Sequence, residues 1–316
     1  MSELPVDIRR LIILAAVVIS MTSCGGRNNS ADQVGSSGYI APAEVLKAQS
    51  GDLSLYVRKA GGLEPADTLI ASNGGPGQSS HYMLDLEQLA GPELAVVTYD
   101  QRGTGRSDSP PPSSDNFELA DYVADLEAVR QSIGVEKVHL LGHSWGALVT
   151  AGYAIAYPEN VASLTLMGGA APEWVETRAG MSRFQRHLAE LQRAGIIPST
   201  LPADGGEQFE AILPAYLSDP AATLEGWVPS QYDEMTNRLT WSTIQSYDLT
   251  EALGALTMPV LVLWGEDDPF GKAMAENTRD ALTAADVDYV LLQGCGHYWH
   301  ECPGEFYPVL IEFLER

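Results

Sequence analysis

The chain has 316 residues, 45% of them hydrophobic, and only three cysteines, so it can bury the core of one large domain or two small ones. This composition excludes an intrinsically disordered chain and a small protein held together by disulfides. Eighteen Lys and Arg against 42 Asp and Glu give a formal net charge of -24. Because such a surface repels phosphate backbones and anionic lipid headgroups, we expect no nucleic-acid partner.

The N-terminal residues are a different kind of sequence. Two arginines precede an apolar run over residues 11–21, which is typical of a signal peptide and too short for a comfortable transmembrane span. The run ends in Met21-Thr22-Ser23-Cys24, which resembles the cleavage box of a bacterial lipoprotein. We therefore predict a signal peptide over residues 1–23 and a tether over residues 24–44, lipidated at Cys24. An ordinary cleaved signal peptide with an incidental cysteine is the alternative.

The residue after Cys24 bears on the location of the protein. It is Gly25 and not Asp, which resembles the pattern of lipoproteins sorted to the outer membrane. We expect the chain on the periplasmic side of that membrane in a bacterial cell envelope. The lipid anchor is then its only contact with the membrane.

After the tether, short apolar runs alternate with helical patterns, and each run ends in a Gly-rich or polar turn. The predicted strands are Leu53 to Val57, Thr68 to Ser72, Leu94 to Tyr99, Val138 to Leu141, Ala162 to Met167, Val260 to Trp264 and Tyr289 to Leu292. Helices are predicted over residues 117–133, 147–157 and 306–314. Fully apolar strands that alternate with helices are typical of an α/β fold, with a mostly parallel sheet covered on both faces.

One stretch, residues 171–256, breaks this alternation. It contains no convincing strand, but helical patterns occur over residues 181–194 and 208–217. We predict that it forms a helical cap on the carboxyl edge of the sheet, where open α/β sheets place their ligands. The core is then built from residues 45–170 and 257–316.

A nucleophile motif follows the fourth predicted strand. Gly142-His143-Ser144-Trp145-Gly146 stands between an apolar strand and a helix-prone segment, the context of a nucleophile elbow. Both glycines are needed because neighbouring Cβ atoms would collide with the adjoining strand and helix. Ser144 is therefore the predicted nucleophile, at a helix N-terminus whose dipole favours a developing negative charge.

A catalytic triad requires an acid and a histidine later in the chain, in that order. Asp268 follows one late strand and His297 follows the next, so both are expected at the carboxyl edge of the sheet. His297 would act as the base and Asp268 would orient it. The adjacent carboxylates are interpreted as turn or capping residues, and a second nearby histidine as a packing residue; these are Glu266, Asp267 and His300. The other four histidines, His143 among them, are interpreted as structural.

The oxyanion of an acyl-transfer intermediate needs backbone N–H donors. Trp145 supplies one after the nucleophile. The second is expected from the Gly-rich turn Asn73-Gly74-Gly75-Pro76-Gly77, after an earlier strand. We assign it to Gly75, since Pro76 has no N–H.

Three motifs together resemble the prolyl iminopeptidase family of α/β-hydrolases. They are Asn73 to Gly77, Tyr99-Asp100-Gln101-Arg102-Gly103-Thr104-Gly105-Arg106-Ser107-Asp108, and Gly142 to Gly146. The resemblance runs from about Leu53 to the C-terminus and implies hydrolysis through an acyl-enzyme without a cofactor, with a helical cap over the site. It also implies removal of an N-terminal residue. For Asp100 and Arg102 we expect a structural role, as a pair that satisfies the charges and backbone of a buried loop.

The chain departs from the family at two points. Asn73 stands where the family usually has His, which changes the local hydrogen bonds but preserves the backbone donors. The family holds the free amino group of its substrate with cap carboxylates, commonly in a Trp-Glu pair, whereas here Trp241 is followed by Ser242. The carboxylates that could substitute are Glu173, Glu176, Asp233 and Glu234.

The sequence therefore predicts a serine hydrolase, with an aminopeptidase that removes Pro or small N-terminal residues from short peptides as the preferred activity. An esterase, an amidase or a C–C bond hydrolase with the same machinery is the alternative, and a non-catalytic ligand-binding lipoprotein is the more remote one. No metal is expected, although Cys295, His297, His300 and Cys302 could be drawn as a zinc cluster. Whether Cys295 and Cys302 pair, and the oligomeric state, stay open.

Overall fold

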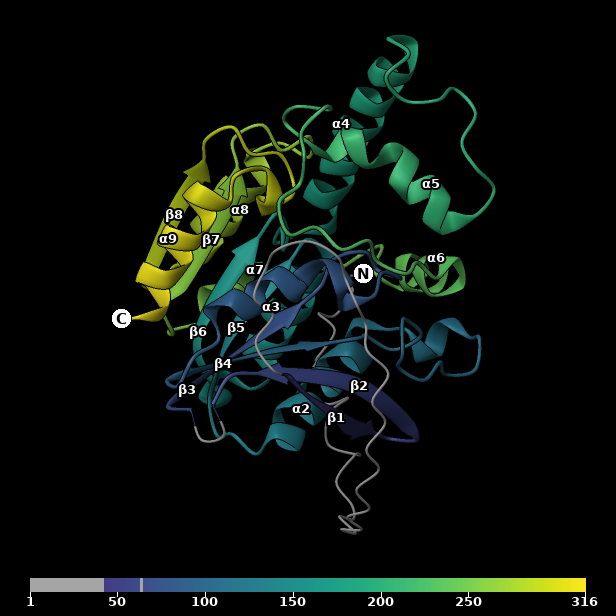
Figure 1. Cartoon of the computed structure of the whole chain (residues 1–316). Coiled ribbons are helices and arrows are strands. Elements are labelled where there is room, and N and C mark those ends of the chain that lie inside the picture. The colour runs from purple at the N-terminus through teal and green to yellow at the C-terminus, as the bar shows by residue number, and fades with distance from the viewer. Residues whose placement is uncertain (1–42, 63–64) are drawn as a thin grey trace, which may run out of the picture.

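The computed structural model describes residues 43–62 and 65–316, so the predicted signal peptide and Cys24 lie outside the described residues. The chain forms one eight-stranded sheet in the order β1-β2-β4-β3-β5-β6-β7-β8 (Figure 1). The strands are β1 (Ala43–Ser50), β2 (Leu53–Ala60), β3 (Asp67–Ser72), β4 (Leu94–Tyr99), β5 (Val138–His143), β6 (Val161–Met167), β7 (Val260–Gly265) and β8 (Val287–Leu292). The pairs β1/β2 and β2/β4 are antiparallel, and all other neighbours are parallel.

The sheet is covered on both faces, as the apolar strands predicted. On one face, Ile70 belongs to a buried cluster that includes residues of α2 (Leu119–Ile133), α3 (Trp145–Ala156), α7 (Thr250–Gly254) and α8 (Ala273–Ala281). Its neighbours Leu69 and Ala71 pack on the opposite face with the 3-10 helix η1 (Ser80–Leu89) and with α9 (Pro303–Leu314). Successive side chains of a strand point to opposite faces, so burial on both sides requires continuous apolar runs. The predicted α/β-hydrolase architecture is confirmed.

The edge strand β1 is absent from the predicted elements. Most of its side chains are exposed or half-buried, so it lacks the apolar run that marks the inner strands. Ala43 and Glu44, which the sequence assigned to the tether, belong to this strand. The sheet therefore begins two residues before the predicted start of the core.

Between β6 and β7 the chain forms the cap. Its helices are α4 (Trp174–Arg193), α5 (Gly205–Ile212), the 3-10 helix η4 (Leu213–Tyr216) and α6 (Glu234–Thr243), and they lie together beyond one end of the sheet (Figure 1). Phe184 of α4 stacks on Phe270 of the core, with ring centroids 5.1 Å apart. The helix predicted over residues 208–217 changes to 3-10 geometry at Leu213, beside Pro214. Helix α7, within the range predicted for the cap, packs into the main core through Leu253.

Three short 3-10 helices complete the fold: η2 (Ser114–Asn116), η3 (Pro158–Asn160) and η5 (Trp299–Glu301). Across residues 43–62 and 65–316, no helix combines the length and the apolar character that a bilayer crossing requires.

Candidate active site

Ser144 lies in a sharp turn between β5 and α3, with φ 56° and ψ -119°. Few side chains adopt a positive φ, so the turn holds Ser144 in a strained backbone conformation. A Cβ atom on Gly146 would lie 2.0 Å from the carbonyl oxygen of Ser72, and one on Gly142 would lie 2.4 Å from that of Gly146. Both glycines are therefore required for β3, β5 and α3 to approach as closely as they do.

Replacing Gly146 with Ala should prevent stable folding, because the added methyl group meets rigid backbone on β3. We expect a loss of more than about 3 kcal/mol in the free energy of unfolding, measured by urea denaturation. Gly304→Ala is the matched control, since its Cβ meets nothing within 4 Å. Equal stability of the two variants would contradict this account of the elbow.

His297 and Asp268 form a buried pair. His297 Nδ1 lies 2.7 Å from Asp268 Oδ2, and the two side chains are 2% and 0% exposed. The other carboxylate oxygen of Asp268 accepts a hydrogen bond from the N–H of Phe270 at 2.8 Å. The backbone N–H of His297 donates to the carbonyl of Tyr216 in the cap at 2.7 Å. The orientation of the imidazole is thus fixed by contacts on both its ring and its backbone.

The neighbouring candidates lie elsewhere. Glu266 and Asp267 are exposed, and Asp267 accepts a hydrogen bond from the hydroxyl of Ser218. His300 is buried on the far side of the loop, where its Nε2 lies 2.9 Å from the carbonyl of Tyr82. Of the three adjacent carboxylates, Asp268 is the one that contacts His297.

A cavity of about 320 Å³ brings the candidate residues together. Ser144 and His297 both line it, and so do Gly75 and Trp145, the two predicted oxyanion donors. Gly75 has φ 126°, in the region that favours glycine. A carbonyl group bound at Ser144 would therefore meet the imidazole and the Gly-rich turn within one cavity.

The turn that carries Gly75 is braced by amide side chains. Asn73 donates from Nδ2 to the carbonyls of Gly74 at 2.9 Å and Gln78 at 2.7 Å, so it closes the turn without a histidine. Gln101 donates to the carbonyl of Asn73 at 2.8 Å and accepts a hydrogen bond from the indole N–H of Trp145 at 2.9 Å. Gln101 thus links the Gly-rich turn to the residue that follows Ser144.

Arg102 and Asp100 do not form the pair that the sequence suggested. The Arg102 guanidinium binds Asp125 through two contacts of 2.7 and 2.8 Å. Asp100 accepts hydrogen bonds from the backbone N–H groups of Ser80 and Arg106, each at 2.9 Å. Both residues keep a structural role, but with separate partners, because the loop turns their side chains in different directions.

A buried hydrogen-bond chain connects three parts of the site. The N–H of Gly74 donates to the hydroxyl of Tyr82 at 2.5 Å, and that hydroxyl lies 2.7 Å from His143 Nδ1. His143 Nε2 lies 2.8 Å from the carbonyl of His297. Burial lowers the pKa of His143 well below its ordinary value, so the ring is neutral and donates from Nε2 alone. The sequence marked His143 as structural but held no signal that joined it to Tyr82.

Tyr82→Phe should destabilise the protein by about 1–3 kcal/mol, because it leaves the Gly74 N–H and His143 Nδ1 buried without this partner. The urea midpoint should fall while the slope of the transition stays constant. Tyr289→Phe is the matched control, since its buried hydroxyl has no partner among residues 43–62 and 65–316. If the urea midpoint of Tyr289→Phe falls as far as that of Tyr82→Phe, loss of the hydrogen-bond chain is not the cause of the destabilisation.

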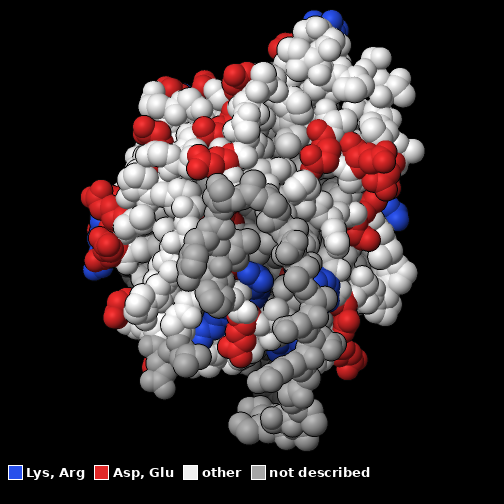
Figure 2. Space-filling model, viewed as in Figure 1, with Lys and Arg blue, Asp and Glu red and all other residues white. Residues whose placement is uncertain are grey.

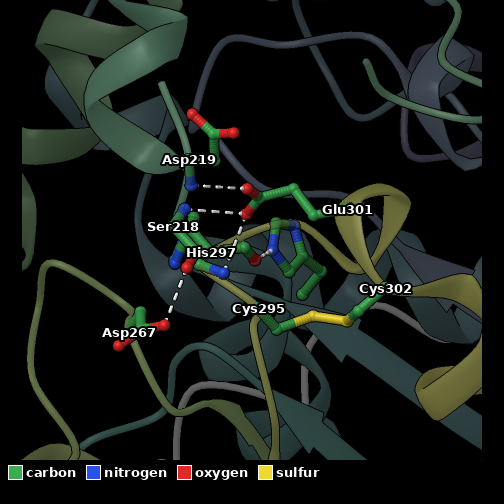
Figure 3. The surroundings of a disulfide bond; sticks show 9 residues. Ser218, Asp219, Asp267, Cys295, His297, Glu301 and Cys302 are labelled. Atoms are coloured by element: carbon green, nitrogen blue, oxygen red, sulfur yellow. Dashed lines mark hydrogen bonds between the residues drawn. A yellow bond between two sulfur atoms is a disulfide. The ribbon is translucent and has the colours of Figure 1, made fainter. Parts of the chain in front are cut away.

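The loop that carries His297 is closed by a disulfide between Cys295 and Cys302, with Cα atoms 5.7 Å apart (Figure 3). Within this loop, the Glu301 carboxylate accepts hydrogen bonds from three backbone N–H groups (Figure 3), those of Gly296, Ser218 and Asp219, at 2.8, 3.0 and 3.2 Å. These contacts join the histidine loop to the cap. Across the described part of the chain, no group of three or more His, Cys, Asp or Glu side chains is arranged to hold a metal.

Comparison with known proteins places this chain in a family. The model of the alpha/beta hydrolase fold family matches residues 67–301. The proline iminopeptidase of Lactobacillus delbrueckii subsp. bulgaricus is 29% identical over 270 residues, which cover 78% of this chain and 89% of that protein. That of Thermoplasma volcanium is 27% identical over 268 residues, which cover 78% and 88%.

A solved structure of the proline iminopeptidase of Mycobacterium smegmatis has the same fold, with a TM-score of 0.65 and 23% identity over 86% of this chain and 98% of that one. The family match spans most of the chain, from β3 to the loop that carries His297. The chain therefore belongs to the alpha/beta hydrolase fold family.

Proposed function

We propose that the protein is a serine hydrolase that works through an acyl-enzyme, with Ser144, His297 and Asp268 as its catalytic residues. One observation carries the proposal: a strained serine at a strand-to-helix turn shares a cavity with the histidine of a buried His–Asp pair. A buried carboxylate bound to an imidazole favours one tautomer and stabilises the imidazolium form. That combination suits proton transfer from a hydroxyl.

In the proposed mechanism, His297 Nε2 takes the proton of Ser144 as the serine oxygen attacks a carbonyl carbon. The oxyanion accepts one hydrogen bond from the N–H of Gly75 in the Gly-rich turn. It accepts another from the N–H of Trp145 at the N-terminal end of α3. The imidazolium then protonates the leaving group, which departs and leaves an acyl-serine. Water activated by His297 hydrolyses this ester and restores the serine.

Two substrate classes fit this chemistry. The relatives named proline iminopeptidase support an aminopeptidase that removes an N-terminal Pro or small residue from short peptides. The lining of the cavity supports a second class, esters or amides whose acyl group carries no charge. The two classes differ in the free amino group next to the scissile carbonyl.

The experiment that tests the hydrolase proposal is active-site titration of the purified domain. A fluorophosphonate should add one phosphonyl group to the peptide that contains Ser144. A p-nitrophenyl ester should release a burst of nitrophenol equal to the enzyme concentration. A folded protein that shows neither label nor burst would refute the proposal and would favour a ligand-binding protein.

We also propose that the chain is exported and anchored to a bacterial cell envelope through lipid on Cys24. The signal-like N-terminus and the Met21 to Cys24 sequence support this. Cells that express the full chain should incorporate labelled palmitate into the protein. Incorporation that persists in Cys24→Ala would refute the anchor.

A further inference from the structure

The cavity beside Ser144 is lined by uncharged groups. The cap contributes apolar side chains from three helices, with Met181 and Phe184 from α4, Ile212 from α5 and Trp241 from α6. The core contributes Phe270. Two exposed glutamines, Gln185 and Gln208, are among the polar lining residues. A group that enters this space exchanges water for aromatic and aliphatic surface.

The lining contrasts with the rest of the molecule. The chain has 42 acidic residues, and acidic side chains gather in several clusters on the face shown in Figure 2. Among the residues that the structure describes, no Asp, Glu, Lys or Arg lines the cavity. Ser242, where the resemblance would place a carboxylate, is exposed and does not line it either. The cavity beside Ser144 is thus lined without acidic or basic side chains, although the protein as a whole is strongly acidic.

From this we infer that the protein selects substrates whose acyl group is uncharged and apolar, and that it discriminates against a free ammonium beside the scissile carbonyl. The inference rests on the proposed serine-hydrolase chemistry and concerns only the acyl group. An ammonium buried without a counter-anion loses its hydration and gains no compensating charge. An aliphatic chain of the same shape gains from burial against the aromatic walls.

None of the four carboxylates that could substitute, Glu173, Glu176, Asp233 and Glu234, lines the cavity. Among them, Glu176 is the one with a buried, unpartnered oxygen in the described residues. Glu176 accepts a hydrogen bond from Asn277, and its other oxygen is buried without a partner in the described part of the chain. Burial raises its pKa, so forming the anion that an ammonium would need costs more here than for an exposed glutamate. Thr177, the next residue in the chain, lines the cavity, and so does Tyr247. Their hydroxyls form a hydrogen bond with each other at 2.6 Å. Substitution of Glu176 therefore tests whether this carboxylate binds an amino group.

The test compares hexanoyl and norleucyl p-nitrophenyl esters, which differ only in the amino group beside the carbonyl. At about pH 6 that amino group is protonated. We expect kcat/KM of the wild-type protein for the hexanoyl ester to exceed that for the norleucyl ester by at least about 100-fold. The rate of hydrolysis measured in the presence of Ser144→Ala is subtracted as the background. Equal rates, or a preference for norleucyl, would overturn the inference.

Three variants locate the effect. Gln185→Glu places a carboxylate in the lining and should shift the ratio of the two kcat/KM values toward norleucyl by about fivefold or more. Gln192→Glu makes the same change on the same helix outside the lining and should leave the ratio unchanged. Glu176→Gln should also leave it unchanged. A norleucyl activity that depends on Glu176 would overturn the inference and assign that residue to amine binding.

Fluorophosphonate titration separates the two possible failures. A protein that takes the label at Ser144 yet prefers the norleucyl ester remains a serine hydrolase, and only the substrate class is wrong. A folded protein that does not take the label would refute the serine-hydrolase mechanism. The inferred preference for an uncharged acyl group would then be refuted as well.

Discussion

Replacing Ser144 with Ala is expected to abolish fluorophosphonate labelling and to reduce kcat by about 10⁶-fold, because it removes the hydroxyl proposed to form the acyl-enzyme. Any residual rate would come from binding and from the oxyanion donors. The measurement is intact mass after labelling, together with steady-state hydrolysis of an activated ester. Unchanged labelling of Ser144→Ala would show that another residue is the nucleophile.

A second serine serves as the control for Ser144→Ala. Ser163 on β6 is buried and lies 2.8 Å from His139 Nδ1, outside the cavity. Ser163→Ala likewise removes a buried serine hydroxyl, here from strand β6, and should retain both the label and the rate. Thermal unfolding of the two variants should show that both remain folded.

The second large effect is expected for Asp268→Asn, which should reduce kcat at neutral pH by about 10⁴-fold. The carboxylate accepts a hydrogen bond from His297 Nδ1, which leaves Nε2 free to take the proton of Ser144. An asparagine amide can instead donate to Nδ1, so the proton then resides on Nε2 and blocks the base. Burst kinetics would locate the loss in the acylation step.

Asp267→Asn is the matched control for this prediction, since Asp267 is the exposed neighbour that contacts Ser218. Its kcat should stay within a few-fold of wild type. A loss as large as that of Asp268→Asn would mean that the acid of the site has been assigned to the wrong carboxylate.

Local sequence was sufficient for the inner strands of the sheet and for the turn that carries Ser144. The inner strands are buried on both faces, so each reads as an apolar run that ends in a turn. The elbow was predictable from its strand, Gly-x-Ser-x-Gly and helix pattern. Only the clash that requires Gly142 is local to the turn, whereas Gly146 faces the backbone of Ser72 on β3. The edge strand β1 escaped prediction because its side chains are mostly exposed.

Tertiary structure alone decided which groups meet across the carboxyl edge of the sheet. The sequence favoured Asp268 over its two acidic neighbours, but only the folded turn brings its carboxylate to His297. The contact between Tyr82 and His143 spans 61 positions, and the disulfide depends on how one loop closes. The uncharged cavity is also a product of assembly, since its walls come from cap helices and core segments far apart in the chain. Periodicity reports burial along one element, whereas a site is defined by contacts between elements, and those form only in the folded chain.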